Sequence, residues 1–143
     1  MNYFYKFFAG ALLCGLAFHS AAQVLVENAW VQLAPPTITV NAVYMEINNP
    51  QLRPQTIVSL NADCCAMVML HNTRKVGDKV VMEHLDYLAI PAQSSVQLAP
   101  GGLHIMLMEP HEELTLETKV KLTFNFSDGS TQEFDLDVKK NEL

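Results

Sequence analysis

The sequence predicts an all-β fold, with the strands packed as a β-sandwich or a small Greek-key barrel in a single domain. Short segments that alternate apolar and polar residues recur along the chain, and glycine, proline, asparagine and aspartate separate them. No stretch combines a sustained helical period with helix caps. About 120 residues remain after the N-terminal segment, a length that suits one hydrophobic core.

The N-terminal segment, residues 1–22, resembles a secretory signal peptide. Lys6 provides its positive charge, residues 7–18 are mainly apolar, and the small residues at 20–22 fit a cleavage site. We therefore expect a signal peptide at 1–22 and one folded domain at 23–143, in a periplasmic protein. An uncleaved N-terminal anchor is the alternative, although the apolar run is short for a membrane span.

Four strands are expected in the first half of the domain, at residues 24–32, 40–48, 55–61 and 66–71. The second alternates apolar and polar residues around Met45. Pro35-Pro36 and Asn49-Pro50 end the first two strands, because proline cannot donate to a sheet. Residues 61–65 are expected to form a loop or a short helical turn.

Five further strands are expected in the second half, at residues 79–87, 95–98, 103–108, 120–126 and 133–138. Gly77-Asp78 precedes the first of these and is typical of a hairpin tip. Pro91-Ala92-Gln93 and Pro100-Gly101-Gly102 provide the next two turns. Asp128-Gly129 joins the last two strands as a tight hairpin.

Charge and motif content exclude several function classes. The formal net charge is −6, and it becomes −7 without Lys6. An acidic surface argues against nucleic acid and anionic membranes as partners. No apolar run beyond the signal is long enough to span a membrane, so stable membrane insertion is not expected. Neither a nucleophile elbow nor a phosphate-binding glycine loop occurs, and the protein is not expected to be an enzyme.

Cysteine usage is unusual for an exported protein. Cys14 lies in the expected signal after Leu12-Leu13, an unfavourable context for lipid attachment. Cys64 and Cys65 are adjacent, and a disulfide between neighbours is strained. The pair could be reduced, oxidised with strain or bridged to another molecule. A thiol redox protein therefore remains an alternative function, although no C-x-x-C motif is present.

Methionine and histidine gather on one face of several expected strands. Because side chains alternate along a strand, residues 103–108 place Leu103, Ile105 and Leu107 on one face and His104, Met106 and Met108 on the other. In the same way, residues 66–71 place Met67, Met69 and His71 together, and Met82 shares a face with His84. Three segments thus present soft donors opposite an aliphatic face.

These donor types favour Cu(I). Thioether sulfur is a soft, uncharged ligand, and neutral imidazole adds nitrogen donors. Zinc would prefer thiolate, imidazole or carboxylate. The spacing between Cys65 and His71 does not suit a blue-copper electron-transfer site.

The spacing of four of these residues follows the pattern H-x10-M-x21-H-x-M, formed by His71, Met82, His104 and Met106. In this pattern, and in the segments 26–31, 42–45 and 100–108, the chain resembles the periplasmic CuA-chaperone family, PCuAC. The resemblance covers residues 24–138.

The resemblance to PCuAC implies a cupredoxin-like Greek-key β-sandwich that binds Cu(I) through the four motif residues. It also implies delivery of copper to the copper centres of cytochrome c oxidase or to another copper chaperone. A periplasmic copper buffer or resistance protein remains an alternative. Cys64-Cys65 and Met69 depart from the family pattern, and Met69, His84 or Met108 could form additional copper contacts.

Overall fold

The computed structural model describes residues 23–140, which form ten strands and no helix, whereas the expected signal peptide lies outside the described residues. The strands are β1 (Leu25–Gln32), β2 (Val40–Asn49), β3 (Gln55–Ala62), β4 (Cys65–Val76), β5 (Lys79–Leu85), β6 (Leu88–Ile90), β7 (Ser94–Leu98), β8 (Leu103–Pro110), β9 (Lys119–Phe126) and β10 (Thr131–Lys139). The predicted all-β, single-domain fold is confirmed.

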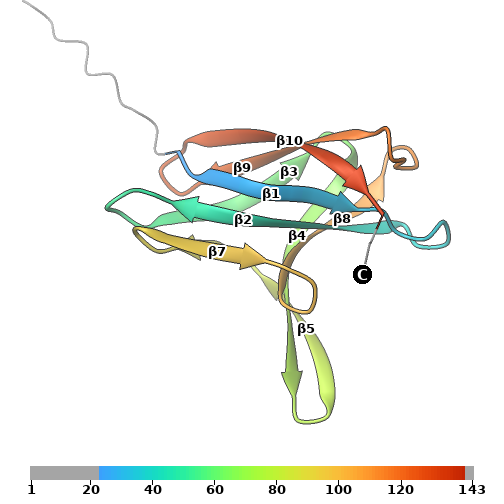
Figure 1. The fold of residues 1–143 in the computed structure, drawn as a ribbon, viewed down its shortest axis with the longest axis horizontal. Helices are drawn as coiled ribbons and strands as arrows, with labels where there is room; N and C mark the ends of the chain where they lie inside the picture. Colours follow the sequence, from blue (N-terminus) through green and yellow to red (C-terminus); the bar gives the residue numbers. More distant parts are fainter. Residues whose placement is uncertain (1–22, 141–143) are drawn as a thin grey trace, which may run out of the picture.

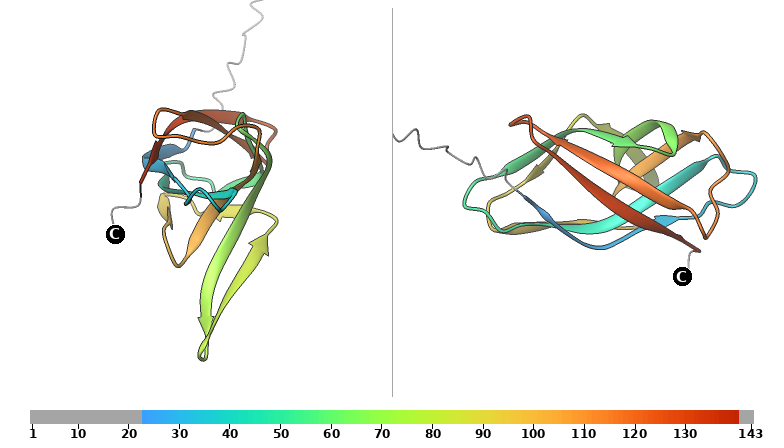
Figure 2. Two further views of the ribbon diagram at one scale, coloured as in Figure 1. Left: turned by 90° about the vertical axis from the view of Figure 1, so that its right-hand side faces the viewer. Right: turned by 90° about the horizontal axis from the view of Figure 1, so that it is seen from above.

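One continuous sheet links these strands in the order β5-β4-β8-β2-β1-β10-β9-β3-β6, and β7 also pairs with β2. The sheet curls round on itself, so that β3 and β9 lie across the interior from β2 and β8 (Figures 1 and 2). All neighbouring strands are antiparallel except β1 and β10, which run parallel. The curl gives each strand an inner and an outer face.

The inner face forms one apolar core. Alternation is clearest in β2, where every second residue is buried, including Val43, Met45 and Ile47. Phe124 of β9 is completely buried against them in the same cluster. Burial of this apolar surface stabilises the fold by roughly 25 cal/mol per Å². The core therefore fixes which residues of each strand face outward.

Several strands begin or end at other residues than predicted, and the largest differences lie around β4 and β6. β6 was not predicted, because a three-residue strand between Asp86 and Pro91 is too short to show alternation; it pairs with β3. β4 continues to Val76, five residues beyond its predicted end, because it pairs with β5 over this stretch. Of the two alternatives predicted for residues 61–65, a loop or a short helical turn, the structure has the loop, a two-residue turn between β3 and β4.

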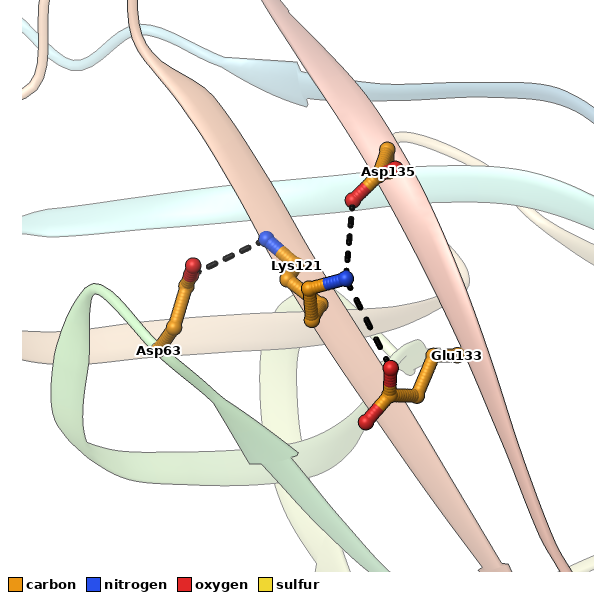
Figure 3. Close-up of polar contacts among 4 residues, drawn as sticks. All are labelled: Asp63, Lys121, Glu133 and Asp135. Carbon is orange, nitrogen blue, oxygen red and sulfur yellow. Dashed lines mark hydrogen bonds and ion pairs between the residues drawn. The ribbon is translucent and has the colours of Figure 1, made fainter.

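The turn from β3 to β4 is held against β9. The Asp63 carboxylate accepts a hydrogen bond from the Lys121 backbone N–H at 2.9 Å, and the Asp63 N–H donates to the Lys121 carbonyl at 3.2 Å. The Lys121 ammonium also faces Glu133 and Asp135 at 3.5 and 3.6 Å (Figure 3). Those exposed ion pairs contribute little stability. The backbone contacts fix the point at which β4 begins.

The β4–β5 hairpin projects from the body of the sheet (Figures 1 and 2). Val76 pairs with Lys79, which leaves a two-residue turn at Gly77-Asp78, as predicted. Gly77 has φ +60°, a conformation that glycine adopts without strain. Within residues 23–140, no helix is long and apolar enough to cross a membrane.

Candidate metal centre

Three histidines lie side by side on the outer face of the sheet. β4 pairs with β8 on one side and with β5 on the other, and the registers place His71 opposite both His104 and His84. The His71 ring centroid lies 6.0 Å from that of His104 and 5.4 Å from that of His84. We call these three residues the histidine row. Its centre, His71, is the neighbour of both other imidazoles.

The core packs directly behind the histidine row. Leu70 and Ile105, which neighbour His71 and His104 in sequence, are buried, and their strands pair in register. The predicted aliphatic face is therefore confirmed over this part of β4 and β8. Alternation breaks down at the start of β4, where Cys65 is buried and Ala66 is exposed. The break lies where the chain leaves the turn at Asp63.

His104 is held in one orientation. Its side chain is only 7% exposed, and its Nδ1 lies 2.9 Å from the carbonyl oxygen of Gly102. The same carbonyl accepts a hydrogen bond from the Thr73 N–H at 3.0 Å, which ties the turn before β8 to β4. Because a carbonyl can only accept, Nδ1 must carry the proton of this ring. This hydrogen bond leaves Nε2 as the ring nitrogen that can bind a metal, the arrangement found in most metal-bound histidines.

His71 contains a buried nitrogen that lacks a hydrogen-bond partner. Its Nδ1 is shielded from solvent, and no other described residue donates to it or accepts from it. Burial lowers the pKa of His71 below its usual value, and the nearby charges of His84 and His104 in their protonated forms lower it further. Both effects favour the neutral form of the ring. Buried polar atoms are rarely left without partners, and a metal ion would satisfy this one.

Methionines occupy the next positions along the same face. Met69 pairs with Met106, and Met67 pairs with Met108, across β4 and β8. We call these two pairs the methionine rows. Met106 and Met69 are half-buried beside the histidine row, because they are only two residues from His104 and His71. The structure thus brings His71, His104 and Met106 together, as expected.

Met82 lies further out. It is on β5 opposite Thr73, not opposite a histidine or methionine, and its side chain is 54% exposed. It shares the outer face with His71 and is diagonally next to it, but β4 separates it from His104. Among residues 23–140, no three His, Cys, Asp or Glu side chains converge on one point. A metal at this face therefore requires thioether donors in addition to imidazole.

His84, a predicted additional copper contact, is close to His71 because the two residues are paired across β4 and β5. Its ring faces His71, and its Nε2 lies 3.6 Å from the exposed Asp86 carboxylate. His84 and Met69 also line a cavity of about 200 Å³ between β3 and β4. The Met69–Met106 and His84–His71 pairings depend on strand register, which spacing within the sequence does not determine.

The cysteines lie apart from the histidine row. Cys64 and Cys65 are both free thiols. Cys65 is six residues before His71 on β4, which corresponds to about 20 Å along the strand. A hydrogen bond from Cys65 lowers the pKa of Cys64, whereas that bond and burial raise the pKa of Cys65. The two thiols therefore do not join the histidines in one metal site.

Sequence comparison identifies relatives along nearly the whole domain. The family model described as putative lipoprotein LpqE-like matches residues 24–138. The putative lipoprotein Lxx21020 of Leifsonia xyli subsp. xyli is 35% identical over 120 residues, which cover 83% of this chain and 71% of that protein. The uncharacterized protein RP573 of Rickettsia prowazekii is 29% identical over 106 residues, 58% of its own length.

Solved structures share the fold. The solution structure of CuI-DR1885 from Deinococcus radiodurans is 31% identical, with a TM-score of 0.68, and the match covers 88% of this chain and 87% of that one. The apo-DR1885 structure is 30% identical, with a TM-score of 0.65 and coverage of 99% and 95%. The copper-bound PCuAC domain from PmoF2 has the same fold at 20% identity, with a TM-score of 0.68 and coverage of 82% and 93%. The predicted resemblance to PCuAC domains is confirmed.

The family description also bears on location. A lipoprotein-like family indicates that the chain lies outside the cytoplasm. Lipid attachment at Cys14, which the sequence disfavours, falls outside both the matched and the described residues.

Proposed function

Because the chain belongs to the LpqE-like family and has the fold of PCuAC domains, we propose that it is a periplasmic copper metallochaperone. It binds one Cu(I) ion as cargo, through His71, Met82, His104 and Met106. It then passes the ion to a copper-accepting protein, and no chemical bond of a substrate is made or broken. One relative, DR1885 from Deinococcus radiodurans, has been solved in a Cu(I) form, which supports this choice of metal.

The observation that carries the proposal is the pairing of two imidazoles beside a thioether. His71 and His104 are directly opposite, and each has a nitrogen free for a metal. Met106 adds sulfur from the adjacent position on β8. These donors are uncharged, so they suit a soft monovalent ion better than Mg²⁺, Ca²⁺ or Zn²⁺.

Met82 completes the donor set from the projecting hairpin. Its position diagonally next to His71 and its 54% exposure give the thioether room to turn toward the ion. A partner protein could then displace Met82 first, because this donor is the most exposed of the four. Ligands exchanged one at a time would move copper without releasing it into solution.

The recipient follows from the family resemblance. We propose a copper domain of cytochrome c oxidase, or another copper chaperone, as the acceptor. Export would depend on cleavage of the signal after residue 22, so that the secreted protein begins at Gln23. Mass spectrometry of the exported chain tests this cleavage directly.

A Cu(I) titration tests the binding site. Under anaerobic conditions, the protein competes with a chromogenic Cu(I) chelator, and we expect one tightly bound equivalent. Met106→Leu conserves volume but removes the thioether, so the tight equivalent should weaken at least tenfold. Met45→Leu is the matched control, because Met45 is 1% exposed in the core and faces away from the site. Equal affinities in all three proteins would refute the site.

Transfer distinguishes delivery from storage. The Cu(I)-loaded protein is mixed with an apo copper domain of the oxidase, and the two proteins are separated and assayed for copper. A chaperone should transfer its ion faster than the ion dissociates into a chelator solution. Transfer no faster than that dissociation would instead favour a copper buffer.

A further inference from the structure

The methionine rows extend the donor face beyond the proposed site. Moving from the histidine row along β4 and β8, the next facing pair is Met69–Met106 and the one after it is Met67–Met108. Each step of two residues spans about 7 Å along a strand. Directly opposite residues have Cβ atoms about 5 Å apart, so facing thioethers can reach one ion. Four thioethers thus follow one another on a single outer face.

These methionines are not ordinary core packing. Met67 is 36% exposed, and Met69 and Met108 are half-buried, whereas Leu107 on the opposite face is completely buried. On the β2 side, Met108 pairs with Val40, and no bulky polar residue stands opposite it there. On the other side, β5 pairs with β4 only from Leu70 onward. The thioethers of Met67 and Met69, which precede Leu70 on β4, are therefore accessible to a small ion from solution.

From this arrangement we propose a second Cu(I) site formed by Met67, Met69 and Met108. The site is separate from the four proposed ligands and goes beyond the proposed function, since it gives the chain capacity for a second ion. Met67 and Met108 face each other, and Met69 is the diagonal neighbour of Met108. All three donors are uncharged thioethers, which bind soft monovalent ions and have little affinity for hard divalent cations.

The second site is weaker than the first, because it lacks imidazole. It would therefore fill after the histidine site and empty before it. Met69 also faces Met106, a ligand of the first site, so the two sites share a border. An ion could cross this border by exchange of thioethers, without passing through water.

The test uses the full-length mature protein with its methionine methyl groups labelled with ¹³C. The probe is Ag(I), a redox-inert soft ion that substitutes for Cu(I), and its binding is followed by NMR. The first equivalent should shift the methyl signals of Met106 and Met82. The second should shift those of Met67, Met69 and Met108, and leave Met45 unchanged.

A double variant tests the second site without changing any proposed ligand of the first. Met67→Leu combined with Met108→Leu should lower the Ag(I) and Cu(I) stoichiometry from two to one, with a normal thermal melt. Met45→Leu, the buried control, should retain two. Leucine conserves volume at these partly exposed positions, so folding should be preserved.

Each alternative outcome is distinct. Saturation of the wild-type protein at one equivalent would overturn the second site and leave the chaperone proposal intact. A second equivalent that persists in the double variant would overturn it as well, and would place that ion elsewhere, for example at Cys64. If the Met106 and Met82 signals stay unchanged while those of Met67, Met69 and Met108 shift, the proposed function fails and the second site stands.

Discussion

Neighbouring residues of β8 should respond to mutation in opposite ways, because they face opposite sides of the sheet. Leu107 is 0% exposed in the core, and Met106 is half-buried on the outer face beside His104. Leu107→Ala removes buried methyl groups and leaves a cavity, which costs about 3–5 kcal/mol. For a domain of this size, we expect the melting temperature to fall by about 10–20 °C.

Met106→Leu should behave in the opposite way. The substitution conserves volume, so its cost in stability should stay below about 1.5 kcal/mol. Loss of the sulfur should still weaken Cu(I) binding at least tenfold. Thermal unfolding of the metal-free proteins, followed by circular dichroism, measures the first effect. Anaerobic competition with a chromogenic chelator at 15 °C, where Leu107→Ala remains folded, measures the second.

These opposite responses depend on the alternation of faces, and the two variants can refute it. If Leu107→Ala lowered Cu(I) affinity as much as Met106→Leu while the protein remained folded, the two residues would not act from separate faces. A large loss of stability in Met106→Leu would have the same meaning, since it would make that thioether part of the core.

Three further predictions concern protonation, thiol reactivity and one turn. Burial lowers the pKa of His71 in the folded chain below the usual 6.5, so the unfolded chain binds the proton first as pH falls. The free energy of unfolding should therefore decrease from about pH 6.5 down to the folded-state pKa. The melting temperatures of the metal-free protein at pH 7.5 and 5.5 should differ less in His71→Gln than in the wild type. The Cys65 hydrogen bond lowers the pKa of Cys64, so Cys65→Ala should move the pH profile of Cys64 alkylation to higher pH, and an unchanged profile would exclude that bond. Gly101 has φ +79°, and Gly101→Ala should cost about 1–2 kcal/mol in a urea titration. At Gly102 a Cβ would meet only the Ala99 carbonyl at 3.6 Å, so Gly102→Ala should be close to neutral, and equal losses would contradict the role given to the positive φ of Gly101.

The sequence determines much of the fold because alternation is a local property. All nine predicted strands occur, and the apolar partners of His104 and His71, Ile105 and Leu70, are buried as expected. β6 was not predicted because its three residues are too few to show an alternation of apolar and polar side chains. β4 extends to Val76 because it pairs with β5, which follows it in the chain. The alternation of apolar and polar residues at the start of β4 does not predict this pairing.

The sequence does not predict which residues of different strands lie opposite one another at the site, because this depends on strand register. Spacing along the chain does not show that His71 is opposite both His84 and His104, since each pair combines two strands. It also does not show that Met82 is opposite Thr73, two residue pairs beyond His71–His84 toward the tip of the hairpin. These alignments are set by the turns at Gly77 and Gly102 and by the core behind them.

The strands that carry the proposed copper ligands differ in local stability, because β5 belongs to the projecting hairpin and β8 lies inside the sheet. β5 is hydrogen-bonded to β4 alone, and all but one of its residues are exposed. β8, in contrast, is flanked by β4 and β2, and its Ile105 and Leu107 side chains are buried in the core. Segments with few buried contacts open at a low free energy, often without unfolding of the rest of the protein. Backbone amides of β5 should therefore exchange with deuterium well before those of β8. Met82 and His84 would separate from the histidine side chains of β4 and β8 in brief local openings, while His71 and His104 stay together.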